Sequence, residues 1–98
     1  MQEQKQITLE ELRKHIDAVD TLLIKCLAKR QDIVLQIAKI KKQENLPIFC
    51  PEREKELMEE RVEIGIQCGI NPSLIETVFR SILAESKNIQ LSEVKNEK

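Results

Sequence analysis

The fold is decided by residues 8–43, TLEELRKHIDAVDTLLIKCLAKRQDIVLQIAKIKKQ, in which apolar side chains recur at alternating steps of three and four. The recurring apolar residues are Leu9, Leu12, Ile16, Val19, Leu23, Cys26, Ile33, Ile37 and Ile40. This spacing is typical of a heptad repeat along one face of an α-helix, and Arg30 stands where the repeat expects another apolar residue. Thr8 followed by Glu11 matches a capping box, and neither glycine nor proline occurs before Pro47. We therefore predict one uninterrupted helix with an apolar seam along one side.

The length of this helix predicts that a second copy of the chain packs along it. About 36 residues at 1.5 Å each give a rod of roughly 54 Å. A compact domain of about 100 residues has a radius of gyration near 13 Å, and hence a diameter of roughly 35 Å. The rest of the chain is too short to cover the whole seam, so we expect an intertwined homodimer.

Two shorter helices follow, each marked by residues that start or stop helices. The proline and acidic residues of PERE at 51–54 suit a first turn, and Gly69 suits a helix end. Asn71 followed by Pro72 is a capping residue with proline at the first helical position. The apolar face of the third helix is formed by Ile75, Val78, Phe79, Ile82, Leu83 and Ile89. Because the residues from 92 onward are polar, we predict a single all-α domain over 1–98 with an ordered core at about 8–91.

The composition excludes several other classes of protein. Two aromatic residues, two glycines and three prolines favour helix over a β-sandwich or barrel. A net charge of −1 argues against a nucleic-acid binder. Three cysteines without a CxxC pair, and a single histidine, predict neither a disulfide framework nor a metal site. There is no apolar run long enough to cross a bilayer and no recognisable signal peptide. We expect a cytoplasmic protein with no cofactor, metal, membrane or nucleic-acid partner.

The informative positions are those where a charged side chain replaces an apolar one. Arg30 lies in the seam, where burial of an unpaired guanidinium would be costly, so an anion should meet it. Lys41 follows about three turns and roughly 16 Å later along the axis, on nearly the same face of the helix. Two long side chains leaning inward would leave a slot sized for a small organic anion.

Other polar residues extend this pattern. The apolar stripe of the third helix continues into Ser86 and Gln90, and Arg53 stands in the first turn of the second helix. Arg13 lies about 25 Å from Arg30 along the first helix, so only the second chain of an antiparallel dimer could bring it to the same ligand. Each residue could instead be structural, as a paired charge, a solvated side chain or a satisfied interface amide. Their coincidence favours a binding site for an anion.

The chemistry that the sequence lacks narrows the type of reaction. There is no Ser/His/Asp set, no activated cysteine, no metal box and no glycine-rich phosphate loop. An enzyme with only cations and amide donors would suit a pericyclic rearrangement, which needs neither a nucleophile nor a cofactor. Such a reaction is accelerated by holding a reactive conformer and by stabilising the charge that develops in the transition state.

From about Leu9 to Gln90 the chain resembles the all-α chorismate mutase family. The matching segments are LRKHID at 12–17 with Asp20, Arg30, KIK at 39–41, LPI at 46–48, PERE at 51–54, and FRSI at 79–82 leading to Ser86 and Gln90. Any one of these segments would be weak, but their combined spacing is specific. The resemblance implies the Claisen rearrangement of chorismate to prephenate, on the route to phenylalanine and tyrosine. It also implies an intertwined homodimer with two composite sites.

The resemblance also implies roles for the polar residues. Arg30, together with Arg13 donated by the other chain, would hold the substrate carboxylates. Lys41 would bridge a carboxylate and the ether oxygen, and Gln90 would donate to the same oxygen. Bond breaking places negative charge on that oxygen, so two donors there would stabilise the transition state more than the substrate.

The remaining site residues lie on the second and third helices. By the same resemblance, Arg53 and Glu54 would line the site, with Glu54 accepting from the ring hydroxyl, and Ser86 would complete the carboxylate pocket. Members of the family often carry an aspartate where this chain has Cys50. Because cysteine cannot supply that carboxylate, recognition of the ring hydroxyl would rest more on Glu54 and on backbone groups.

Three alternatives remain open at this stage. Isochorismate-pyruvate lyases share the fold, but they lack an acid at the position of Glu54 and carry a bulkier residue at that of Ser86. Both residues therefore favour the mutase, whereas Cys50 leans toward the lyase. A mutase acting on 4-amino-4-deoxychorismate is a more distant alternative. A non-enzymatic helical dimer is an alternative of another class, in which protein groups would satisfy Arg30 and Gln90.

Overall fold

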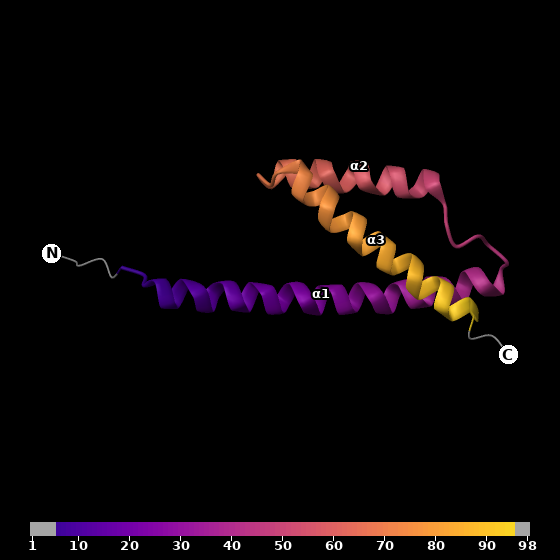
Figure 1. Ribbon diagram of the computed structural model, residues 1–98, viewed down its shortest axis with the longest axis horizontal. Coiled ribbons are helices and arrows are strands. Elements are labelled where there is room, and N and C mark those ends of the chain that lie inside the picture. The colour runs from indigo at the N-terminus through magenta and orange to yellow at the C-terminus, as the bar shows by residue number, and fades with distance from the viewer. Residues whose placement is uncertain (1–5, 96–98) are drawn as a thin grey trace. The chain divides into compact units, whose positions relative to one another are not determined.

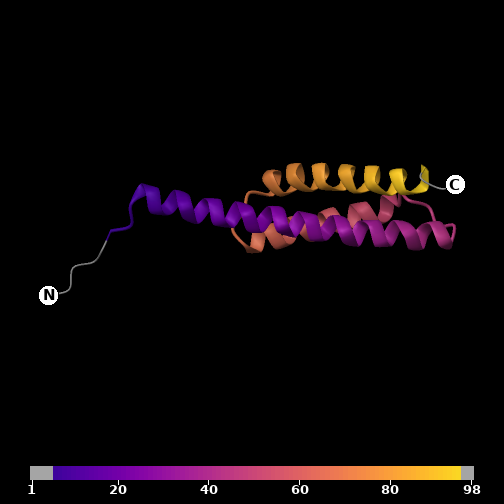
Figure 2. The ribbon, with the colours of Figure 1, turned by 90° about the horizontal axis from the view of Figure 1, so that it is seen from below.

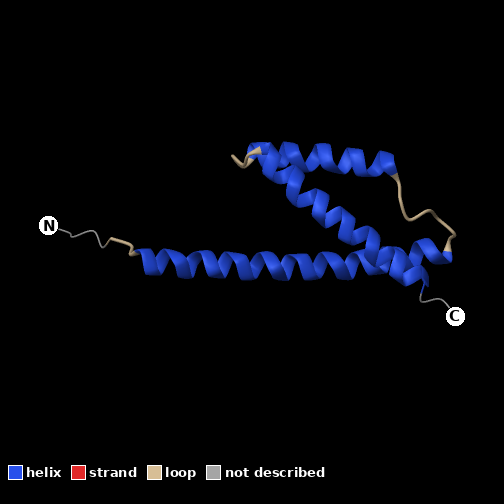
Figure 3. Ribbon diagram, viewed as in Figure 1, coloured by secondary structure: helices blue, strands red, loops and turns tan. Residues whose placement is uncertain are grey.

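The computed structural model describes residues 6–95, and all regular structure in that range is helical (Figures 1 and 3). The helices are α1 (Leu9–Gln43), α2 (Pro51–Gln67) and α3 (Pro72–Lys95). The prediction of an all-α fold with one long N-terminal helix is therefore confirmed. Contacts within the chain divide it into two compact units, with the division in α1 between Arg30 and Gln31. The second unit contains the last turns of α1 together with α2 and α3.

The first unit consists of the beginning of α1 and leaves its apolar residues uncovered. The helix starts as predicted, because Thr8 Oγ1 accepts a hydrogen bond of 3.1 Å from the Glu11 N–H. Within residues 6–30, Leu27 and Arg30 are partly buried and every other residue is exposed. Leu23, in the middle of the seam, is 59% exposed. This stripe of α1 is thus an apolar surface rather than part of a core.

The second unit builds its core from all three of its helices. The buried residues are Val34 and Ala38 of α1, Leu57 and Gly65 of α2, and Ser86 of α3. The predicted seam residues Ile33 and Ile37, each one position before a buried residue, remain exposed. Here α1 therefore carries two adjacent apolar stripes, one packed inside the unit and one on its surface.

Close packing of α2 against α3 depends on a glycine. The side chain of Ile75 occupies the space where a Cβ atom of Gly65 would lie, with Ile75 Cδ1 only 3.0 Å from that position. From its contact with α2, helix α3 returns to the last turns of α1 (Figures 1 and 2), where Lys42 Nζ donates to the Glu93 carbonyl at 3.5 Å. One helix therefore connects the end of α2 with the end of α1.

The helix ends follow their local sequence. Gly69, at φ 77°, ends α2, and the Ile70 N–H donates to the Gly65 carbonyl at 2.8 Å, as in a Schellman motif. Asn71 Oδ1 accepts from the Ser73 N–H at 2.9 Å and caps α3, as predicted. At the end of α1 a second left-handed residue, Asn45 at φ 55°, makes the same type of turn.

The end of α3 differs from the prediction. The helix continues to Lys95, whereas the ordered core was predicted to end at about residue 91. Residues 92–95 are polar except for Val94 and include neither glycine nor proline, so nothing in them stops a helix. The helix therefore extends past the predicted end of the core as far as Lys95. The parts of the predicted domain at 1–5 and 96–98 lie outside the described residues.

Candidate active site

Lys41 lies in the last turn of α1 and is held by two acceptors from other parts of the second unit. Its Nζ donates to the Ile48 carbonyl at 2.8 Å and to Gln90 Oε1 at 3.0 Å, and all three groups are partly buried. An ammonium group has three N–H donors and no acceptor. Two of the donors are engaged by these contacts, which leaves the third for a ligand.

The contact with Lys41 also decides which way the Gln90 amide faces. Because Lys41 can only donate, the atom that meets it must be the amide oxygen, and the amide nitrogen faces away. This nitrogen donates to the Ser86 carbonyl at 3.4 Å. An amide nitrogen carries two hydrogens, so a second donor remains beside the Lys41 ammonium. The two side chains therefore present adjacent donors from α1 and α3.

Ser86 lies one helical turn before Gln90 and is the buried polar side chain of the described core, at 8% exposure. Its hydroxyl donates to the Ile82 carbonyl at 2.9 Å, a bond within α3. A hydroxyl has one hydrogen, so Ser86 Oγ must rotate away from Ile82 before it can donate to a ligand carboxylate. The predicted role of Ser86 therefore requires one rotamer change about the hydroxyl.

The beginning of α2 supplies the next group of predicted residues. Cys50 is the N-cap, at φ −128° and ψ 98°, and its exposed thiol makes no capping hydrogen bond. Its carbonyl accepts from the Glu54 N–H at 3.0 Å. Arg53 is exposed and Glu54 is partly buried. A cation and an acid thus stand in the first turn, where the helix leaves its first N–H groups without partners inside the helix.

The two remaining arginines belong to the first unit. Arg13 is exposed, whereas Arg30 is partly buried and takes part in an interaction. The structure therefore brings Lys41, Ser86 and Gln90 together through direct contacts, while Arg13 and Arg30 are placed only within their own unit. Sequence reasoning missed the Ile48 carbonyl. No signal in the sequence could have revealed it, because every residue has a backbone carbonyl, whatever its side chain.

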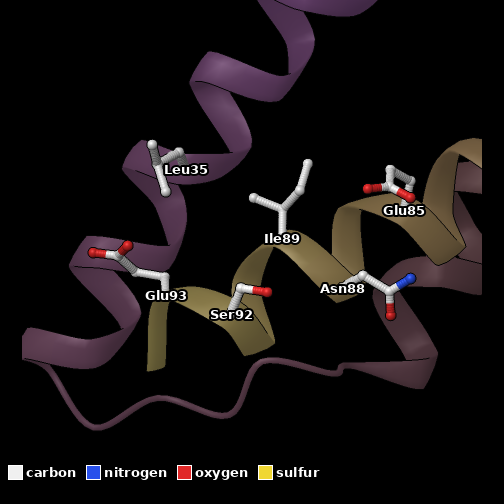
Figure 4. Close-up of a pocket in the computed structure, with 6 residues that line it drawn as sticks. All are labelled: Leu35, Glu85, Asn88, Ile89, Ser92 and Glu93. Atoms are coloured by element: carbon white, nitrogen blue, oxygen red, sulfur yellow. The ribbon is translucent and has the colours of Figure 1, made fainter. Parts of the chain in front are cut away.

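A separate open cavity of about 360 Å³ lies beside α3 and is not the predicted site. Figure 4 shows its lining, which is Leu35 from α1 and Glu85, Asn88, Ile89, Ser92 and Glu93 from α3. The two glutamate side chains would repel a dianion. The α3 residues predicted to bind the anion, Ser86 and Gln90, lie on a different stripe of the helix.

The described residues also bear on metal binding, disulfide bonding and membrane insertion. No group of three or more His, Cys, Asp or Glu residues among them could hold a metal ion. All three cysteines fall within this range and are free thiols. None of the three helices there has the length and apolar character needed to span a membrane.

Comparison with known proteins points to one family. A family model described as "Chorismate mutase type II" matches residues 12–91. The chain is 42% identical over 78 residues to the T-protein of Haemophilus influenzae, and this match covers 80% of the chain and 21% of that protein. It is 33% identical to the bifunctional chorismate mutase/prephenate dehydratase of Aquifex aeolicus, covering 84% of the chain and 24% of the relative.

A third relative has a length similar to that of the chain. The chorismate mutase of Methanocaldococcus jannaschii is 29% identical over 82 residues, which cover 84% of the chain and 83% of the relative. By contrast, the chain spans about a fifth of the T-proteins that it matches.

Proposed function

Because the chain belongs to the chorismate mutase type II family, we propose that it converts chorismate to prephenate in the cytoplasm, as a step toward phenylalanine and tyrosine. The observation that carries this proposal is the contact between Lys41 Nζ and Gln90 Oε1 at 3.0 Å. It joins two side chains from distant parts of the sequence and leaves each with one donor beside the other. Paired donors suit a reaction in which charge builds up on a single oxygen atom.

The proposed mechanism uses these donors on the ether oxygen of chorismate. As the carbon–oxygen bond breaks, negative charge grows on that oxygen, and the donors of Lys41 and Gln90 stabilise it. No proton is transferred and no covalent bond to the protein forms. The gain comes from donors that are already oriented, since the Ile48 carbonyl and the Ser86 carbonyl hold them before the substrate arrives.

The other site residues bind and orient the substrate. Arg30 and the Arg13 of a second copy hold the two carboxylates, and Ser86 joins them after its hydroxyl turns away from Ile82. Arg53 lines the site from α2. We assign the ring hydroxyl to Glu54 and the backbone around Cys50, whose own side chain supplies no carboxylate.

The proposal includes a homodimer that completes each site. The seam of α1 is apolar and exposed, and an open groove of about 520 Å³ in the first unit is lined by Leu12, His15, Ile16, Val19 and Asp20. Exposed apolar surfaces of this extent are unusual in monomers and favour association. Burial of each seam leucine or isoleucine would contribute about 1.5–3 kcal/mol. A second copy of α1 matches the length and character of this surface.

The first experiment is to follow the loss of chorismate absorbance and to identify the product. Isochorismate and 4-amino-4-deoxychorismate are tested in parallel. Prephenate from chorismate supports the proposal, and loss of that activity in Lys41→Met with an unchanged circular dichroism spectrum assigns it to this site. Pyruvate and salicylate from isochorismate, with little prephenate, would instead identify a lyase. Turnover of none of the three by the purified dimer would favour the non-enzymatic module.

A further inference from the structure

Two consecutive loop residues, Ile48 and Phe49, receive ammonium groups from two different helices. Lys41 of α1 donates to the Ile48 carbonyl at 2.8 Å. Lys87 of α3 places its Nζ over the Phe49 ring, 4.3 Å from the ring centroid. A cation at this distance from an aromatic face is attracted by the ring quadrupole. The segment between α1 and α2 is therefore tied to both helices at adjacent residues.

The position of the Phe49–Lys87 pair relates it to the site. Lys87 directly follows Ser86 and precedes Gln90 by three residues, while Phe49 directly precedes the α2 cap, Cys50. A shift of Phe49 would move the neighbouring peptide, and with it the Ile48 carbonyl that orients Lys41. The pair thus acts on the same short segment as the proposed ether-oxygen donor, without contacting that donor itself.

We propose that Phe49 and Lys87 form a latch, the cation–π pair that fixes the 44–50 loop and thereby positions the Lys41 ammonium for the reaction. This inference rests on the proposed function. Lys87 and Phe49 are positioning residues in it, since they act through the Ile48 carbonyl. With the latch closed, the Lys41 donor that is not engaged by Ile48 or Gln90 points in one direction. With the latch open, it samples several directions.

The test uses full-length variants and steady-state kinetics with chorismate. Phe49→Leu keeps an apolar side chain but removes the ring face, and Lys87→Met keeps the stem but removes the charge. Both members of the cation–π pair are exposed, so its loss predicts a fall in kcat of about two- to five-fold in either variant, with KM nearly unchanged. The double variant should show no greater loss than either single variant, because both remove the same interaction.

Two further variants separate positioning from other roles. Lys87→Arg retains a cation that can stack on Phe49, so it should keep nearly the kcat of the unaltered protein. Lys95→Met removes another exposed α3 lysine and should change nothing. If Lys87→Met raises KM while Phe49→Leu does not, Lys87 binds the dianion directly and the latch is wrong. Additive losses in the double variant, or a lower Tm with an unchanged kcat, also overturn it.

Amide hydrogen exchange tests the latch independently of the reaction. Within the loop the Leu46 N–H is bonded to the Lys41 carbonyl, and just after the loop the Glu54 N–H is bonded to the Cys50 carbonyl. Both amides should exchange faster in Phe49→Leu, whereas Ile70, in the equivalent turn after α2, should not change. Unchanged exchange at Leu46 and Glu54 refutes the latch. If the unaltered protein turns over no chorismate but exchange responds as expected, the proposed function fails, whereas the ordering of the 44–50 loop by Phe49 and Lys87 stands.

Discussion

Replacing Gln90 by glutamate should make the proposed reaction depend on acid. In the structure the amide oxygen of residue 90 accepts from Lys41 at 3.0 Å, and its nitrogen is the donor offered to the ligand. Gln90→Glu keeps the size and the acceptor but loses the donor whenever the carboxyl is ionised. A carboxylate there would also repel the charge that develops on the ether oxygen. Only the protonated form can replace the amide donor.

The magnitude follows from the geometry. Loss of one donor to a developing oxyanion costs roughly 10²–10³ in kcat. Two opposite charges at about 3 Å interact by roughly 5 kcal/mol at an effective dielectric constant of 20. Because Lys41 is partly exposed, we discount this to about 1 kcal/mol. The ammonium should therefore lower the pKa of the introduced carboxyl below its ordinary value.

The sign of the pH dependence follows directly. Because the active form is protonated, kcat/KM of Gln90→Glu should rise about tenfold for each unit of falling pH until the lowered pKa is approached. The bound dianion disfavours a further negative charge nearby, so it raises the pKa of the introduced carboxyl in the complex. The decline of kcat should therefore occur at higher pH than the decline of kcat/KM.

The assay is chorismate turnover between pH 4 and 8 in buffers of about constant ionic strength. The unaltered protein should be nearly flat over the neutral range, and Gln90→Met, which has no donor at any pH, should be uniformly slow. A Gln90→Glu variant that keeps the rate of the unaltered protein at both pH 5 and pH 8 would remove residue 90 from the ether-oxygen role. A flat and slow profile like that of Gln90→Met would refute the claim that a protonated carboxyl can replace the amide.

Three further changes test the cap, the core and the seam. Cys50→Asp and Cys50→Ser should each raise the free energy of unfolding by about 1 kcal/mol, because the Cys50 side chain makes no capping hydrogen bond. Urea unfolding measures this change. Only Cys50→Asp should also lower KM for chorismate. Gly65→Ala should lower the free energy of unfolding by about 1–2 kcal/mol despite the better helix propensity of alanine, because the added methyl group meets Ile75. If that clash is the cause, Gly65→Ala should cost less stability in a chain that also carries Ile75→Ala. Leu23→Glu should convert the proposed dimer into monomers in sedimentation experiments, whereas Lys25→Glu should not. An unchanged mass of Leu23→Glu would refute the seam as the dimer interface.

The helices were predictable because their signals are local. Gly69 and the Asn71–Pro72 pair mark their boundaries by backbone conformation and hydrogen bonding within a few residues. The turn at Asn45 was not predicted, because asparagine adopts the left-handed conformation less regularly than glycine does. The core stripe of Val34 and Ala38 was not identified, because the longer heptad pattern beside it gives the stronger periodic signal.

The candidate site was predictable only in its side chains. Lys41 and Gln90 could be named from a broken apolar pattern and from family resemblance, but their contact depends on how α3 returns to the end of α1. The role of the Ile48 carbonyl could not be predicted, because a backbone acceptor does not depend on the type of residue. Likewise, nothing in the spacing of Phe49 and Lys87 predicts that a loop aromatic lies beneath an α3 lysine.

A single helix, α1, carries Arg13 near its start and Lys41 in its last turn. In the proposed dimer these two residues belong to different sites. A chain substituted at one of them can therefore form an intact site with a chain substituted at the other. Arg13→Ala and Lys41→Met should each be inactive alone. Refolded together in equal amounts, half the dimers should be mixed, and each mixed dimer holds one intact site and one doubly damaged site. Complementation should therefore restore about a quarter of the original activity, a yield that a site built within one chain could not give.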